Sequence, residues 1–204
     1  MTAIAELKAR KLELEIATAE LELKRLERLE GNNGAAAAEA CVYSLWGTID
    51  KDRVQRCVDA LSTWSRRSPG CDITLIINSP GGSVLDGLAL YDFLKELAAG
   101  HHITTVAAGM AASMGGVLLQ AGQHRVMGAN AWMMIHEVSS LGVGKASDLE
   151  DEVKLVERLQ TQLVAILSHR STLTERQIRN RWKRRDWWLT ASEAQSLGFC
   201  DEVR

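Results

Sequence analysis

The stretch that decides the fold of this chain is VAAGMAASMGGVLL, residues 106–119. Residues 102–107 are apolar and rich in β-formers, which predicts a buried strand, and we expect a helix after Ser113 whose first turn consists of small residues. Ser113 is the one hydroxyl at this switch, and the first turn of a helix has N–H groups without intrahelical acceptors. Ser113 therefore has the features of a nucleophile with half of an oxyanion hole, or of an ordinary N-cap serine on a tightly packed helix.

Composition and charge are those of an ordinary globular protein. The 204 residues carry a net charge of −2, without the strongly basic balance typical of proteins that bind nucleic acid or anionic membranes. The apolar runs are too short to span a membrane, and the charged N-terminus is not typical of a signal peptide. The cysteines lack C-x-x-C pairing and zinc-like histidine spacing; they are Cys41, Cys57, Cys71 and Cys200. We therefore expect buried, reduced thiols, no metal or other cofactor, and a cytoplasmic protein.

The chain divides into an N-terminal segment, a linker and one larger domain. Residues 1–30 contain neither Gly nor Pro and carry apolar residues at alternating spacings of four and three, which predicts a charged amphipathic helix. We expect this helix to serve oligomerisation or partner binding, with a solvated appendage as the alternative. Two Gly residues and an Ala-rich run make residues 31–40 a linker. The domain then comprises residues 41–204.

Within this domain, strands and helices alternate along the chain. Strands are expected at 41–49, 72–78, 102–107, 125–127 and 131–135, with 201–204 as an edge strand. Helices are expected after Asp50, at 84–99, from Ser113, at 146–170, after Thr174 and at 191–197. This order predicts right-handed crossovers and an α/β fold, with a mainly parallel sheet and flanking helices. The apolar run 72–78 indicates a strand covered on both faces.

Candidate chemistry lies where three of these strands end, because α/β proteins bind ligands outside the carboxyl ends of their strands. Gly81 and Gly82 can adopt positive φ and expose N–H groups toward a substrate carbonyl, although Pro-Gly is also common in ordinary turns. The loop has no lysine or phosphate-loop spacing, which disfavours a phosphate site. His136 ends the strand 131–135, where it is either a structural histidine or a general base for Ser113.

A serine–histidine pair needs an acid to orient the imidazole and to balance its charge. The candidates are Asp148, Asp151, Asp186, Asp201 and Glu137. Asp186 precedes Trp-Trp-Leu, which we expect to withdraw it from solvent, but an exposed charged turn explains the same pattern. The residues alone therefore leave the choice of acid open.

Four segments resemble the proteolytic subunit of the Clp protease, ClpP, a serine peptidase family. They are Ile77–Val84 (INSPGGSV), Ala111–Gly115 (AASMG), Met134–His136 (MIH) and Arg185–Ala191 (RDWWLTA). They follow the family's order within a similarity that covers about residues 42–203. The resemblance implies the ClpP/crotonase-like fold and a serine endopeptidase with Ser113 as nucleophile, His136 as base and Asp186 as orienting acid. It also implies an oxyanion hole made by the N–H groups of Met114 and Gly82, with Gly81 as the alternative.

The same resemblance implies polypeptide substrates and stacked homo-oligomeric rings, joined through the helix 146–170. The chain departs from the family pattern at Glu137-Val138, where Gln-Pro is usual, and at Met110, where Gln is usual. Its N-terminal segment stands where the family has the loops that help to dock a Clp ATPase. A Clp ATPase is therefore one of two candidate partners.

Such an extension resembles phage and prophage head maturation proteases. That similarity implies a scaffold or capsid protein as the alternative partner, and the host cytoplasm or the prohead as location. The competing functions are a crotonase-type acyl-CoA enzyme and a catalytically silent ring-forming assembly protein.

Overall fold

The computed structural model of the chain describes Arg10 and residues 41–204, apart from 141–142. Contacts divide the chain into two units, residues 1–40 and residues 41–204. The predicted N-terminal helix and linker lie outside the described residues, Arg10 excepted. In the described part of the chain, no helix is long and apolar enough to cross a membrane.

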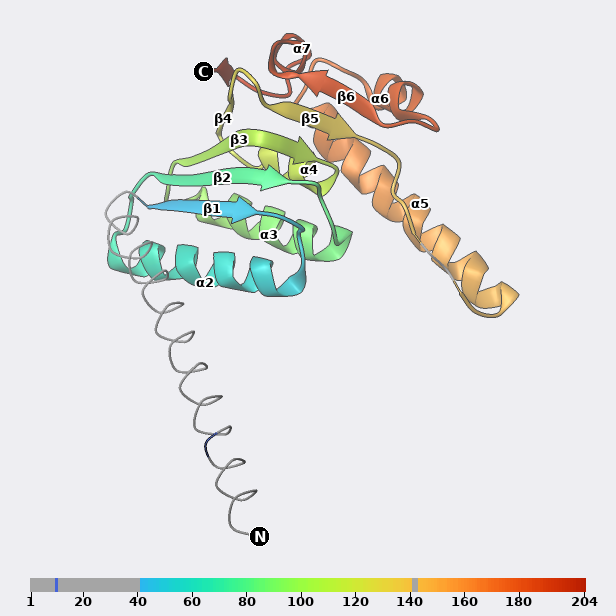
Figure 1. Cartoon of the computed structure of the whole chain (residues 1–204), viewed down its shortest axis with the longest axis horizontal. Coiled ribbons are helices and arrows are strands. Elements are labelled where there is room, and N and C mark those ends of the chain that lie inside the picture. The colour runs from blue at the N-terminus through green and yellow to red at the C-terminus, as the bar shows by residue number, and fades with distance from the viewer. Residues whose placement is uncertain (1–9, 11–40, 141–142) are drawn as a thin grey trace. The chain divides into compact units, whose positions relative to one another are not determined.

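The described part of unit 41–204 is an α/β domain whose elements follow the predicted order (Figure 1). The strands are β1 (Val42–Trp46), β2 (Ile73–Ser79), β3 (Ile103–Ala112), β4 (His124–Met127), β5 (Trp132–Ile135), β6 (Trp187–Thr190) and β7 (Glu202–Val203). The helices are α2 (Lys51–Arg67), α3 (Val84–Leu97), α4 (Met114–Leu119), α5 (Ala146–His169), α6 (Glu175–Trp182) and α7 (Ala191–Ser196).

The sheet is mainly parallel, as predicted. Strands β1-β2-β3-β4-β7 lie side by side in that order and are parallel, with β7 at the expected edge. Strand β3 is longer than predicted, because it pairs first with β4 and then, beyond Gly109, with β5. Strand β6, which the sequence patterns did not predict, pairs antiparallel with β5. This second branch of the sheet carries part of the candidate site.

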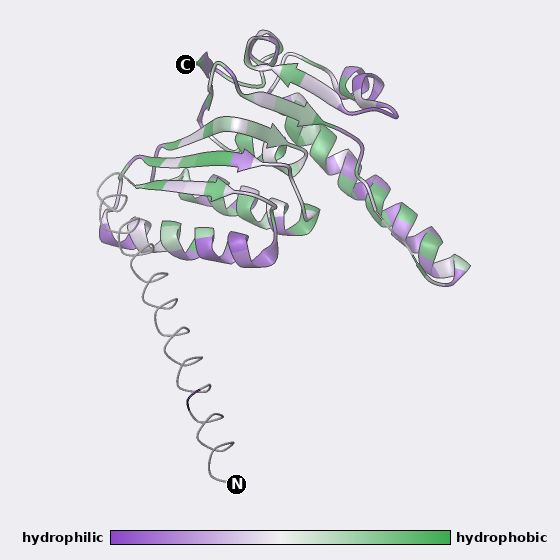
Figure 2. Cartoon of the chain, in the orientation of Figure 1, coloured by the Kyte–Doolittle hydropathy of each residue, from purple (hydrophilic) through white to green (hydrophobic). Residues whose placement is uncertain are grey.

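Helices α2 and α3 lie on one face of the sheet, below the strands in Figure 1. Along β2, residues facing these helices are fully buried, whereas Thr74, Ile76 and Asn78 on the other face are half-buried. The expectation that this strand is covered on both faces is therefore wrong for the described chain. Its apolar character reflects one buried face and one face that is only partly covered. Figure 2 shows the mostly apolar strands beside the polar outer surface of α2.

Helix α2 begins at the predicted cap, where the Asp50 side chain accepts a hydrogen bond from the N–H of Arg53. Its buried side chains include Cys57, while Val58 is half-buried. Three cysteines are buried as expected and Cys71 is half-buried, and all four are thiols.

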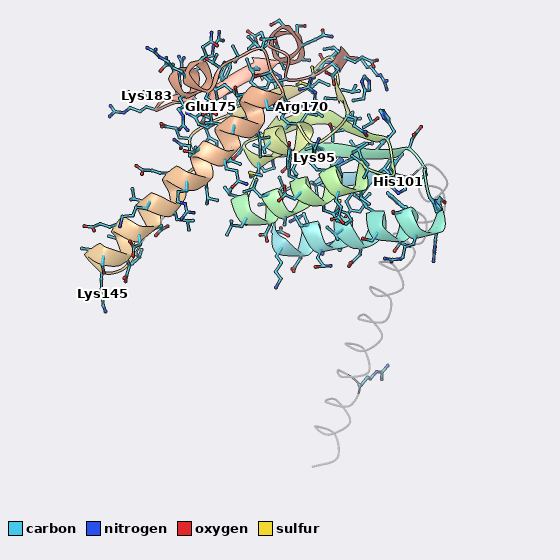
Figure 3. All side chains as sticks on the ribbon, turned by 180° about the vertical axis from the view of Figure 1, so that it is seen from behind. Lys95, His101, Lys145, Arg170, Glu175 and Lys183 are labelled. Atoms are coloured by element: carbon cyan, nitrogen blue, oxygen red, sulfur yellow. The ribbon has the colours of Figure 1, made fainter. Side chains whose placement is uncertain are left out.

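Helix α5 extends away from the sheet, with Lys145 just before its far end and Arg170 just after the other (Figures 1 and 3). It carries an apolar stripe, of which only the second half is buried. Leu163 packs in the core, whereas Val153 is 57% exposed and Leu149 is 37% exposed. Within the described residues, the first half of this amphipathic helix therefore offers apolar side chains that the same chain leaves largely uncovered.

Candidate active site

Ser113 occupies the sharp turn between β3 and α4. Its backbone has φ 53° and ψ −122°, a conformation that costs a non-glycine residue about 1–3 kcal/mol. Its side chain makes no capping bond to α4; instead, its Oγ lies 2.8 Å from His136 Nε2. The interpretation of Ser113 as an ordinary N-cap serine is therefore wrong, because the strained turn presents the hydroxyl to an imidazole rather than to the helix.

The pairing of β3 with β5 brings this serine and histidine together. Ala112 lies opposite Met134, and the N–H of Ser113 donates to the carbonyl of Met134 at 2.8 Å. His136 follows two residues later, just beyond the end of β5. The contact between the two side chains is thus fixed by backbone hydrogen bonds on the serine's side and by the strand end on the histidine's side.

Strand β6 brings Asp186 to the other side of the same imidazole. Ile135 pairs with Trp187, so the residues flanking this pair, His136 and Asp186, lie at the same end of the ladder. Asp186 Oδ1 is 3.6 Å from His136 Nδ1, an ion-pair distance that is longer than a hydrogen bond. The Asp186 side chain is 58% exposed, so the expectation that Trp-Trp-Leu withdraws it from solvent is wrong. In this short strand Leu189 is buried, whereas Trp188 is 44% exposed and does not cover the acid.

The other candidate acids bind groups other than the imidazole. Asp151 pairs with Lys154, Asp148 accepts from the N–H of Lys145, and Glu137 accepts from the N–H of Arg184. Asp201 accepts hydrogen bonds from the backbone and side chain of Arg125. Burial raises the pKa of Asp201, but these bonds outweigh burial and hold the pKa below its usual value. Of the five acids, Asp186 is therefore the one that the structure brings to the imidazole.

The two loop glycines differ in what their N–H groups do. The N–H of Gly81 donates to Ser79 Oγ at 3.0 Å, whereas those of Gly82 and Met114 donate no hydrogen bond within the described part of the chain. Both glycines have positive φ, 99° and 150°, and a Cβ on Gly82 would lie 2.1 Å from the Ile49 carbonyl oxygen. The candidate oxyanion donors with available N–H groups are therefore Gly82 and Met114, and Gly81 is already engaged.

A small cavity of about 40 Å³ adjoins Ser113 and His136. Most of its lining side chains are apolar: Val84, Val117, Ile135, Val138, Leu163, Leu167 and Trp182. They come from α3, α4, β5, α5, α6 and the segment after β5, so the cavity forms where these elements meet. Such a cavity beside a nucleophile suits an apolar substrate side chain.

Sequence reasoning missed two residues that shape this site. Ser79 is fully buried and fixes Gly81, and a serine two residues before a glycine is a recognisable hydroxyl-turn pattern that could have indicated this role. Trp182 is 1% exposed and lines the cavity. No local pattern distinguishes it from an ordinary core tryptophan.

Comparisons with known proteins agree with the fold. The family model described as Clp protease matches residues 34–204. An ATP-dependent Clp protease proteolytic subunit 3 from Rhodococcus jostii is 38% identical over 161 residues, 78% of each chain. A proteolytic subunit 2 from Tropheryma whipplei is 41% identical over 138 residues, 67% of this chain and 75% of the relative. The proteolytic subunit from Bacteroides fragilis is 38% identical over 139 residues, 66% of this chain and 65% of the relative.

The match covers the four motifs and the whole α/β domain. The predicted mixed α/β fold with its mainly parallel sheet is confirmed, as is the resemblance on which the expected peptidase activity rests. The chain belongs to the Clp protease family, a family of serine peptidases.

Proposed function

We propose that this chain hydrolyses peptide bonds with Ser113 as nucleophile, His136 as general base and Asp186 as orienting acid. The observation that carries the proposal is the 2.8 Å approach of Ser113 Oγ to His136 Nε2, at a turn where the serine could instead have capped its helix. This separation lies within the range for proton transfer between a nucleophile and its base.

In the first step, Ser113 Oγ attacks the scissile carbonyl as its proton passes to His136 Nε2. The carbonyl oxygen gains negative charge, which the N–H groups of Gly82 and Met114 stabilise as hydrogen-bond donors. His136 then protonates the departing amine, and a water molecule activated by the same imidazole releases the acyl group from Ser113. Asp186 faces Nδ1 and stabilises the imidazolium by its charge, a role that an ion-pair distance of 3.6 Å fits.

The substrates are polypeptides, and the enzyme works as a homo-oligomeric ring in the cytoplasm. Two features support assembly. The face of β2 opposite α2 and α3 is only half-buried, and the first half of α5 exposes Leu149 and Val153. Buried against other subunits, these surfaces would no longer expose apolar side chains to water.

The partner of the N-terminal segment, residues 1–30, belongs to this proposal as well. Either a Clp ATPase docks on the ring and delivers unfolded chains, or the segment tethers the protease to a phage scaffold or capsid protein in a prohead. Deleting residues 1–34 distinguishes a role in assembly from a role in substrate choice. If the deletion changes neither the mass of the ring nor the cleavage of unfolded chains and of scaffold or capsid proteins, the N-terminal segment has neither role.

Hydrolysis itself is tested with fluorogenic peptides that carry an apolar residue before the scissile bond. We expect the full chain to cleave such peptides and Ser113→Ala to be inactive although folded, as judged by circular dichroism. A crotonase-type acyl-CoA enzyme or a silent assembly protein predicts no cleavage by the full chain. Equal cleavage by Ser113→Ala would contradict the proposed nucleophile.

A further inference from the structure

The turn that carries the orienting acid is held by a carboxylate next to the base. The backbone N–H of Arg184 donates to Glu137 Oε2 at 3.0 Å. Glu137 directly follows His136, and Arg184 lies two residues before Asp186. One hydrogen bond therefore joins the segment after β5 to the turn before β6, beside the contact between imidazole and acid.

The sheet holds this turn only at Trp187, and a backbone hydrogen bond from the N–H of Arg185 to the carbonyl of Trp182 closes its other side. Asp186 lies outside β6, whose ladder with β5 ends at the pair Ile135–Trp187. Arg184 has φ 57°, a left-handed conformation that costs a non-glycine residue about 1 kcal/mol or more. A strained residue of this kind persists where its surroundings fix it, and the bond to Glu137 is the contact made by its backbone N–H.

The segment bearing Glu137 is itself anchored on both sides. His136 follows the last paired residue of β5, and the N–H of Val138 donates to Gln160 Oε1 on α5 at 3.1 Å. Glu137 therefore lies between a strand and a helix of the core. A glutamate whose backbone is anchored in this way can hold the turn that its carboxylate binds.

Charge strengthens this contact. The turn reads Lys183-Arg184-Arg185, and Lys183 points away from the body of the domain in Figure 3. Arg185 is turned back onto its own helix, where its Nε donates to the carbonyl of Arg181. Neither side chain competes for Glu137, whose carboxylate accepts from the backbone N–H of Arg184, and a hydrogen bond to an ionised acceptor is stronger than a neutral one.

We propose that Glu137 is a positioning residue that holds the 184–186 turn so that Asp186 stays against His136. The inference rests on the proposed function, because it assigns Glu137 a role only through Asp186. The 3.6 Å separation between Asp186 Oδ1 and His136 Nδ1 leaves little margin, and without the tether the half-exposed acid turns to solvent.

The test measures the rate constant for labelling of Ser113 by a fluorophosphonate in the full chain. Glu137→Ala should lower this rate about tenfold, whereas Glu137→Gln, which keeps an acceptor oxygen, should stay within about threefold of the wild type. In an Asp186→Ala background, Glu137→Ala should have no further effect, because the residue that it positions is absent. Interacting residues show this non-additivity, and independent ones do not.

Glu193→Ala is the matched control. Its carboxylate also accepts a backbone N–H, that of Thr190 at 2.8 Å, but it caps α7 rather than the catalytic turn. This variant should lower the melting temperature and leave labelling unchanged. The control shows whether a loss of stability alone slows labelling. If Glu137 were merely structural, Glu137→Ala would behave like this control.

Each outcome decides one of the two proposals. If Glu137→Ala labels like the wild type, or slows labelling equally with and without Asp186, the positioning role is wrong. If Glu137→Gln is as slow as Glu137→Ala, the hydrogen bond is not what matters, and the inference is again overturned. If the wild type is not labelled, or Asp186→Ala labels at the wild-type rate, the triad itself fails and the positioning role falls with it.

Discussion

Replacing Gly82 with alanine should slow acylation of Ser113 about a hundredfold in a domain that still folds. The added Cβ would lie 2.1 Å from the carbonyl oxygen of Ile49, whereas real Cβ contacts stay beyond 3.0 Å. The loop must therefore open by the difference, 3.0 − 2.1 = 0.9 Å, and its φ of 150° also disfavours a side chain. The neighbouring backbone takes up this movement, and the N–H of residue 82 moves with it.

A displacement of about 1 Å typically costs around a hundredfold in rate, and removal of one oxyanion donor costs about 10²–10³. A hundredfold loss corresponds to about 2.7 kcal/mol of transition-state stabilisation. The assay is the fluorophosphonate labelling rate at 25 °C, with circular dichroism to verify folding. Gly100→Ala is the control, because a Cβ there meets no heavy atom within 4 Å. Labelling of folded Gly82→Ala within threefold of the wild type would refute the role of this N–H.

Three further predictions concern the nucleophile, the acid and the ion pair between Arg125 and Asp201. Because Ser113 has φ 53°, Ser113→Gly should melt about 2–4 °C above Ser113→Ala in scanning calorimetry, and equal melting temperatures would show that the turn is unstrained. Asp186→Asn should lower peptide turnover by about 10²–10³, less than for a buried triad acid because its side chain is 58% exposed; a loss under threefold would remove it from the triad. Asp201→Asn should cost about 1–2 kcal/mol at pH 7 by urea unfolding, because it leaves buried Arg125 with a weaker partner, while the 36% exposure of the Asp201 side chain lets solvent screen the pair. The folded-state pKa of Asp201 is depressed, so this difference should be complete above about pH 5 and shrink as pH falls below the ordinary value of 3.8; a difference that grows on acidification would contradict the ion pair.

The sequence could predict features that depend on local patterns. The alternation of strands and helices, the cap at Asp50 and the small-residue switch at Ser113 all follow from propensity and spacing, and the structure agrees with each. The choice of Asp186 could not be made in this way, because it depends on the antiparallel register of β6 with β5. Long-range register is set by pairing between strands, and a four-residue strand rich in Trp leaves no clear alternation from which to infer it.

The oxyanion donors show a similar limit. The Pro-Gly-Gly motif leaves two candidate donors, the N–H groups of Gly81 and Gly82. The choice between them depends on the hydrogen bond from Gly81 to buried Ser79, which the motif does not predict. The exposed half of α5 illustrates the opposite case. The apolar stripe along this helix indicates a face that tends to be buried, yet within the described residues Leu149 and Val153 stay exposed. Amphipathicity identifies such a face but not the surface that covers it.

The measurement that tests the central claim most directly is the site of fluorophosphonate attachment, mapped by mass spectrometry on the full chain. The geometry of Ser113 and His136 predicts one modified serine, Ser113, and loss of the label in folded His136→Ala, because the Oγ then lacks a base 2.8 Å away. Labelling at another serine, undiminished labelling of Ser113 in His136→Ala, or no labelling of the assembled wild type would contradict the proposed mechanism.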